Sequence, residues 1–303
     1  MNTKEEGSIV KSLWQSESLW GDDLNKLECA KRALYFYENG FIHLSEVIPH
    51  NLCDMAIREY DAWCNAHAEK MIGIRKDNRN PRVVNLHSQI DQLKDLFTHN
   101  IELLNLLDAL FGYKTCVYTS LMFQYGTEQP FHRDTPVFVT SPERFYFGLW
   151  FALEDADHNN GCLEVIPGSH KVEEDNRYDF AEERFPNIDE IDKNCSNLWM
   201  PWQNKQLQKC LDTGLKLIKV TARKGDCVIW HPQMFHAGSK IVDGNKTRNS
   251  LVFHVTPEYV PVYQGDIFFN RQKANPPSQW NRSYTEYKNR LFLNNGYPSF
   301  GSN

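Results

Sequence analysis

The chain has 303 residues, of which 41% are hydrophobic and 13% aromatic, and its formal net charge at pH 7 is −6. This apolar content suffices for a folded core and excludes a disordered chain, while the acidic balance and the scattered Lys and Arg argue against nucleic acid as a partner. We expect one domain over residues 1–303, because a large β domain with helical additions can reach this length.

The first third of the chain, about residues 1–112, is predicted to be mainly helical. Apolar residues recur there at helical spacing. The predicted helices span residues 22–39, 51–70 and 89–111, and a short strand is expected at 41–47. Gly40 and Gly112 are expected to end the first and last helices, since glycine readily adopts the left-handed conformation found at helix C-termini.

After Gly112 the pattern changes to short β-rich segments separated by turn residues. The predicted strands span residues 114–125, 146–153, 163–166, 217–221, 226–230 and 250–255. No crossover helices alternate with these strands, so the pattern favours an antiparallel sandwich or jelly roll over a parallel sheet. We therefore expect a mainly β fold with helical additions, whose core occupies about residues 113–256.

A long polar segment interrupts the predicted strands at about residues 168–214. A structureless stretch of this length in a compact domain is usually a lid or a binding loop, and we interpret it as a lid over the site. Residues 257–303 are rich in aromatic residues, Pro and Asn. We expect them to form a C-terminal extension that covers the core or contributes to a possible homo-oligomer.

The sequence indicates neither a membrane span nor a secreted protein. Its longest apolar run, residues 145–153, is much shorter than the roughly 18 residues of a membrane helix. The polar first ten residues, with two Glu, do not resemble a signal peptide. The eight cysteines are widely spaced and form no Cys-x-x-Cys pair, so we expect reduced thiols and a cytoplasmic protein.

A His-x-Asp motif supplies the first two candidate metal ligands. His132 and Asp134 are two residues apart, and in an extended chain residues i and i+2 share a face, so both side chains could reach one metal ion. The motif alone is a weak signal. A second His-x-acid pair, at residues 67–69, lies in a predicted helix, where the two side chains would point to nearly opposite sides.

A distant segment supplies the third candidate ligand. Residues 225–236 are predicted to form a strand that leads into a turn ending at His236. Two imidazoles and one carboxylate leave three positions open on Fe(II), as needed for 2-oxoglutarate to chelate through two and for O₂ to occupy the third. His231, five residues earlier, is expected to pack or hydrogen-bond near the site instead.

A cation for the far carboxylate of 2-oxoglutarate is expected at Arg248, in a strand-like run twelve residues after His236. A guanidinium group can bind a carboxylate through two parallel hydrogen bonds. Lys246 is the competing cation, less favoured because it lies in the preceding turn. Two His and one Asp would also suit a zinc hydrolase, but Arg248 favours the oxygenase, since a hydrolase has no fixed need for it.

Residues 37–41, 148–156 and 160–170 extend the pattern beyond the candidate ligands. Together with them, these segments resemble the phytanoyl-CoA dioxygenase family of 2-oxoglutarate oxygenases, and the similarity covers about residues 30–256. The resemblance implies a double-stranded β-helix, a cupin-like jelly roll, with N-terminal helices.

The resemblance also implies roles for individual residues. Iron(II) would bind at the positions matching His132, Asp134 and His236. The co-substrate would bind at Arg248 and pack against Trp150. Ser239, one position later than in some members of the family, would help to hold the co-substrate carboxylate.

The predicted function is that of an Fe(II)- and 2-oxoglutarate-dependent dioxygenase, which uses O₂ to hydroxylate a small organic substrate and releases succinate and CO₂. Asp134 favours hydroxylation over halogenation, because halogenases of this fold need a vacant position in place of the carboxylate. The alternatives are a zinc-dependent hydrolase on the same fold and a non-catalytic protein that binds 2-oxoglutarate or iron. Neither nucleic acid nor a membrane is expected as a partner.

Overall fold

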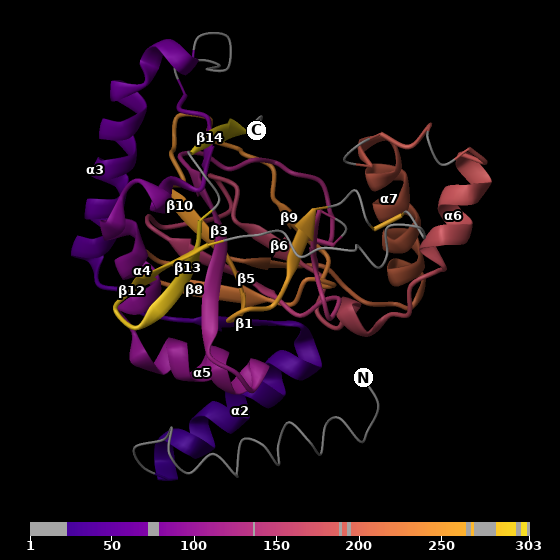
Figure 1. Ribbon diagram of the computed structural model, residues 1–303, viewed down its shortest axis with the longest axis horizontal. Coiled ribbons are helices and arrows are strands. Elements are labelled where there is room, and N and C mark those ends of the chain that lie inside the picture. The colour runs from indigo at the N-terminus through magenta and orange to yellow at the C-terminus, as the bar shows by residue number, and fades with distance from the viewer. Residues whose placement is uncertain are drawn as a thin grey trace.

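A nine-stranded, mostly antiparallel sheet forms the centre of the computed structural model (Figure 1). The structure describes residues 23–71, 79–135, 137–187, 190–192, 195–264, 268–269, 283–294 and 298–301. The main path of the sheet runs β1 (Phe41–Leu44), β8 (Cys227–Trp230), β5 (Phe147–Ala152), β10 (Ser250–Pro257), β3 (Thr115–Phe123), β13 (Arg290–Leu293) and β12 (Tyr284–Tyr287). Beside it, β2 (Arg82–Val84) pairs with β3 and with β14 (Ser299–Gly301).

Two smaller sheets accompany the large one. One has the order β7 (Ile218–Val220), β6 (Leu163–Val165) and β9 (His236–Gly238), and the other pairs β11 (Val262–Gln264) with β4 (Phe138–Thr140). A buried cluster joins Trp150 and Val228 of the large sheet to Leu163 and Val220 of the three-stranded sheet. The two sheets therefore enclose a common interior, as in a jelly roll.

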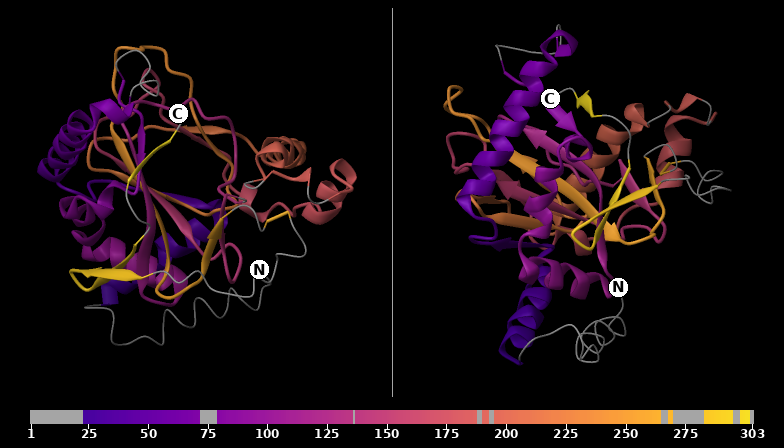
Figure 2. Two further views of the ribbon diagram at one scale, coloured as in Figure 1. Left: turned by 45° about the horizontal axis from the view of Figure 1, so that its top comes forward. Right: turned by 60° about the vertical axis from the view of Figure 1, so that its left-hand side comes forward.

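Helices of the first third cover the outer face of the large sheet (Figure 2). They are α2 (Asp23–Asn39), α3 (His50–Ala66), α4 (Asp95–Thr98) and α5 (Ile101–Phe111), with short 3₁₀ turns at Ala68–Met71, Leu86–Ser88 and Asp91–Lys94. On β10, Leu251 and Phe253 pack into the cluster shared with these helices, whereas Val252 faces the interior between the sheets. Both faces of the central strands are thus buried, which explains their nearly continuous apolar sequence.

The region predicted as a lid is not structureless. It contains a 3₁₀ turn (Ser169–Lys171), α6 (Arg177–Arg184) and α7 (Ser196–Asp212), and both helices lie away from α3, across the molecule (Figure 1). Asn176 begins α6, because its side chain accepts hydrogen bonds from the backbone N–H groups of Tyr178 and Asp179. The prediction of an irregular lid was therefore wrong in its local structure.

Other boundaries also differ from the prediction. Residues 89–111 are not one helix, because Asn100 adopts an extended conformation and its side chain caps α5 by accepting a hydrogen bond from Leu103 N at 3.0 Å. The first strand ends at Leu44, before Glu46 adopts a positive φ of 53°. The division of the chain into core, lid and extension stays a prediction.

Two expectations drawn from composition can be compared with the structure. The eight cysteines are all free thiols. None of the helices in the described part of the chain has the length and apolar character needed to cross a bilayer. The cytoplasmic location stays a prediction.

Acid is expected to destabilise the fold through His87, which is 1% exposed and hydrogen-bonds Ser120 Oγ through Nδ1 at 2.6 Å. Burial, followed by the charge of Lys94, lowers the pKa of His87 from 6.5 to about 3. Between these values the unfolded chain binds a proton that the folded chain does not. The free energy of unfolding should therefore fall as the pH is lowered through this window, by up to about 1.4 kcal/mol per pH unit.

Denaturant midpoints at several pH values between 7.5 and 4.5 would measure this slope. His87→Gln keeps a neutral hydrogen-bonding group and should show a shallower slope than the parent. Equal slopes would contradict the assignment to His87.

Candidate metal centre

Backbone pairing brings the two candidate histidines together. His132 lies in the segment between β3 and β4, and His236 begins β9. The two residues form an isolated antiparallel bridge, in which each backbone N–H donates to the other residue's carbonyl at 3.0 Å. Asp134 N donates to Pro232 O at 3.1 Å, so residues 132–134 and 232–236 are joined at two points.

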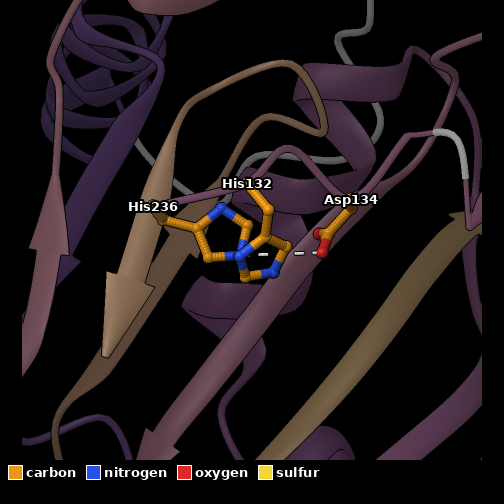
Figure 3. A group of neighbouring side chains, drawn as sticks. All are labelled: His132, Asp134 and His236. Carbon is orange, nitrogen blue, oxygen red and sulfur yellow. Dashed lines mark ion pairs between the residues drawn. The ribbon is translucent and has the colours of Figure 1, made fainter. Parts of the chain in front are cut away.

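The side chains of His132, Asp134 and His236 converge on one buried point (Figure 3). One ligand atom from each lies within 4.8 Å of the others. His236 Nε2 is 3.6 Å from Asp134 Oδ1, and the two imidazole centroids are 4.3 Å apart. The structure thus assembles the three residues that the sequence predicted as ligands, and their role in binding a metal ion stays a proposal.

Hydrogen bonds orient both imidazoles for coordination through Nε2. His132 Nδ1 is 2.8 Å from the carbonyl oxygen of Pro130, and His236 Nδ1 is 3.1 Å from that of Met234. A carbonyl only accepts, so each Nδ1 carries the proton and donates it. Each Nε2 is then unprotonated and can act as a metal ligand, although that of His132 accepts a hydrogen bond from Gln129 Nε2 at 3.1 Å, which a metal ion would replace.

The charge of the group suits a divalent cation. Burial, followed by the neighbouring His236, lowers the pKa of His132 to about 3, so this imidazole is neutral at physiological pH. Burial would raise the pKa of the Asp134 carboxyl, but the imidazoles of His236 and His254 outweigh it and hold that pKa below its ordinary value. A neutral imidazole and an ionised carboxylate are the protonation states that metal binding requires.

Two residues that the sequence analysis missed hold the Asp134 carboxylate. Trp230 Nε1 donates to Asp134 Oδ2 at 2.7 Å, and His254 Nε2 lies 3.4 Å from the same oxygen. Oδ1 remains directed toward His236. His254 could have been suspected, because it lies six residues after Arg248 and an even spacing places both on one face of a strand.

Gly148 makes room for the Trp230 ring. A Cβ atom at residue 148 would lie 2.1 Å from Trp230 Cε2, although the backbone there has no positive φ that would itself exclude alanine. We expect Gly148→Ala to lower the free energy of unfolding by about 1–3 kcal/mol, as overpacking of a buried site does. It should also displace the indole from Asp134.

Denaturant unfolding would measure this effect against Gly244→Ala. A Cβ atom at residue 244 would meet only the end of the flexible Arg79 side chain, at 3.3 Å. Equal stability of the two variants would show that the ring adjusts without cost.

Arg248 is buried at 3% exposure in the same interior. Its Nη1 donates to Gly161 O at 2.7 Å, its Nε has no hydrogen-bond partner, and within the described part of the chain no carboxylate pairs with it. Burial lowers its pKa to about 10, so it is still charged at neutral pH. Lys246, the competing cation, is half exposed and pairs with Asp157 at the surface.

The other two predicted co-substrate residues, Trp150 and Ser239, are both buried. The guanidinium carbon of Arg248 lies 5.6 Å from the Trp150 ring centroid, and Trp150 Nε1 is buried without a partner among the described residues. Ser239 is buried, with its Oγ 3.5 Å from Cys162 Sγ. The structure therefore places Trp150 beside Arg248, whereas Ser239 contacts Cys162, and the roles of all three residues stay predictions.

His231 is separate from the ligand group. Its ring is partly buried and lies 5.2 Å, centroid to centroid, from that of His170, and its Nδ1 accepts a hydrogen bond from Gln233 N at 3.1 Å. Burial holds its pKa well below the ordinary value. It packs and hydrogen-bonds in the segment that leads to His236, as expected.

Sequence comparisons identify one family. A model of the phytanoyl-CoA dioxygenase (PhyH) family matches residues 36–249. The chain is 22% identical over 246 residues to the peroxisomal phytanoyl-CoA dioxygenase of Mus musculus, covering 75% of this chain and 66% of that protein. It is 38% identical over 88 residues to a phytanoyl-CoA dioxygenase of Arabidopsis thaliana, covering 27% and 30% of the two chains. The chain thus spans about two thirds or less of the length of these relatives.

Solved structures share the fold at low sequence identity. The epimerase SnoN, solved with Fe³⁺, alpha-ketoglutarate and nogalamycin RO, aligns with a TM-score of 0.56 at 16% identity, over 88% of this chain and 98% of its own. EctD from S. alaskensis, solved with 2-oxoglutarate and 5-hydroxyectoine, aligns with a TM-score of 0.58 at 12% identity, over 85% and 86%. These similarities confirm the predicted mainly β, jelly-roll class.

The family match covers more than half of the chain and includes the three candidate ligands and Arg248. The predicted family is confirmed, whereas the dioxygenase activity and its cofactors, iron and 2-oxoglutarate, stay predictions for this chain. The chain belongs to the phytanoyl-CoA dioxygenase family.

Proposed function

We propose that this protein is an Fe(II)- and 2-oxoglutarate-dependent dioxygenase that hydroxylates a small organic substrate and releases succinate and CO₂. The observation that carries the proposal is the buried Arg248, which has no carboxylate partner within the described residues and shares an interior with the three candidate ligands. A buried cation without an anionic partner is costly, and the distal carboxylate of 2-oxoglutarate would supply one.

The ligand set fits the metal that this chemistry needs. His132 and His236 would bind through Nε2, because each Nδ1 donates to a backbone carbonyl, and Asp134 would bind through Oδ1, because Trp230 donates to Oδ2. The Gln129 amide, which now donates to His132 Nε2, would give way to the metal ion. Iron(II) held there would supply the activation of O₂ and the oxidative decarboxylation of 2-oxoglutarate.

The protein's own contribution is orientation and exclusion of water. Arg248 would orient 2-oxoglutarate by its distal carboxylate, with the Trp150 ring against the bound molecule. The apolar side chains of Val228 and Val252 line the same interior and limit the access of water to the reacting groups. Ser239 would add a hydrogen bond to the same carboxylate after turning away from Cys162.

An anaerobic titration tests the proposed class. Purified protein receives Fe(II) and then 2-oxoglutarate, and a visible metal-to-ligand charge-transfer band should appear only after the second addition. A screen of small metabolites for stimulated succinate release would then identify the substrate.

The two alternatives give different results. A zinc hydrolase would retain Zn²⁺ through purification and show no band with Fe(II) and 2-oxoglutarate. A non-catalytic sensor would show the band but release no succinate with any substrate. Either result would overturn the proposal. A small-molecule substrate and a homo-oligomer stay predictions.

A further inference from the structure

We infer that α7, through Gln203, is a positioning part of the metal centre, so that metal binding and the order of the 168–214 segment are coupled. The inference rests on the proposed metal site. It assigns to this segment a role beyond covering the site.

Gln203 clamps the backbone that carries two of the candidate ligands. Its Oε1 accepts from Arg133 N at 3.1 Å, and its Nε2 donates to Arg133 O at 2.8 Å and to Thr135 O at 3.1 Å. Residues 133 and 135 flank Asp134, and residue 133 follows His132. Because Gln203 is 0% exposed, the segment cannot shift without leaving buried polar groups unpaired.

Glu174, also in the 168–214 segment, links this segment to the loop that carries His132 and Asp134 and to the loop that leads to His236. Its carboxylate lies 2.8 Å from Arg133 Nη1 and 2.9 Å from Gln233 Nε2, and its side chain is only 8% exposed. Gln233 belongs to the loop that leads to His236. Ser169 O, also in the 168–214 segment, accepts a second hydrogen bond from Arg133 at 3.0 Å.

The helix also contacts a ligand ring directly. Trp199 lies one turn before Gln203, and residues four apart in a helix share a face. Its ring is edge-on to that of His132, with the centroids 5.8 Å apart. One face of α7 therefore holds both the backbone and an imidazole of the centre.

These contacts predict that metal binding and the stability of α7 affect each other. If α7 holds the ligands in their binding geometry, a metal ion bound by those ligands must in turn stabilise α7, because coupling free energies between two sites are symmetric. A helix that merely covers the site would show no such effect.

Gln206 provides a matched control on the same helix. It is 1% exposed, accepts from Asp175 N at 3.2 Å and donates to Asp175 Oδ2 at 3.3 Å. These bonds stay within the 168–214 segment. Gln203→Leu and Gln206→Leu therefore each remove a buried amide from α7, but only Gln203→Leu releases the 133–135 backbone.

The test uses Co(II), whose visible spectrum reports the number and geometry of its ligands. The parent should bind one Co(II). Gln203→Leu should raise its Kd by about 10- to 100-fold and alter the spectrum, as loss of an outer partner of a metal site does. Gln206→Leu should keep the spectrum and affinity of the parent. Equal affinities and spectra for the two variants would overturn the inference.

If Gln203→Leu fails to fold, hydrogen exchange of the parent protein tests the coupling between metal binding and α7. Amides of α7 should exchange more slowly with Co(II) than without it, while those of α3 should not change. Unchanged exchange in α7 of a protein that binds Co(II) would overturn the coupling. Failure of the parent to bind Co(II) at all would instead overturn the proposed metal site.

Discussion

We expect Asp134→Ala to abolish metal binding at the centre and, with it, succinate formation. In the described part of the chain Asp134 is the carboxylate of the ligand group, and the two imidazoles that remain carry no negative charge to offset a divalent cation. Loss of a direct ligand should exceed the roughly 10- to 100-fold effect of losing an outer partner. Co(II) titration and succinate release with the identified substrate would measure the loss.

Asp91→Ala is the control for this prediction. Its carboxylate is 70% exposed and pairs with Lys94 at 2.6 Å, so its removal leaves the centre unchanged. Circular dichroism should show that both variants are folded. Full succinate formation by Asp134→Ala would refute the assignment of the metal ligands.

We expect Arg248→Met to weaken binding of 2-oxoglutarate, while the metal affinity should stay within a few-fold of the parent. Methionine fills much of the same buried volume but removes the guanidinium group. Loss of one partner of a buried ion pair costs about 2 kcal/mol or more of binding free energy, which is roughly a 30-fold rise in Kd. Arg248→Lys should recover only part of the affinity, because an ammonium group lacks the fork that binds a carboxylate through two hydrogen bonds.

Lys246→Met is the matched control, since Lys246 is the rival cation and lies half exposed. The anaerobic 2-oxoglutarate titration of the Fe(II) protein would be repeated on each variant. If Lys246→Met weakened binding and Arg248→Met did not, the assignment of the co-substrate cation would be reversed.

Local sequence patterns located most of the core strands. Residues 114–125, 146–153 and 226–230 contain β3, β5 and β8, and residues 250–255 cover β10 except for its last two residues. A short apolar run bounded by turn residues is a local property of the chain. The strands β12 to β14, within 257–303, were not predicted. Of these, β13 pairs with the distant β3 and β14 with the distant β2, whereas β12 pairs with its neighbour β13, and their own sequences carry no comparable apolar run.

The helix α7 shows why part of the candidate site escaped prediction. Its buried face includes Gln203 and Gln206, two polar residues that an apolar periodicity cannot reveal, and Pro201 lies within the helix. Burial of these glutamines is possible only because their amides bind groups far from them in sequence, Arg133 for Gln203 and Asp175 for Gln206.

The sequence by itself determined which groups are available for the proposed chemistry: two imidazoles and a carboxylate as candidate ligands, and an arginine as the candidate partner of the co-substrate. The tertiary structure decided which atoms face one another, through the bridge between His132 and His236 and the hydrogen bond from Trp230 to Asp134. The physical reason is that these contacts join residues about a hundred positions apart, and such pairings are selected by the packing of whole sheets, which no local pattern of residues records.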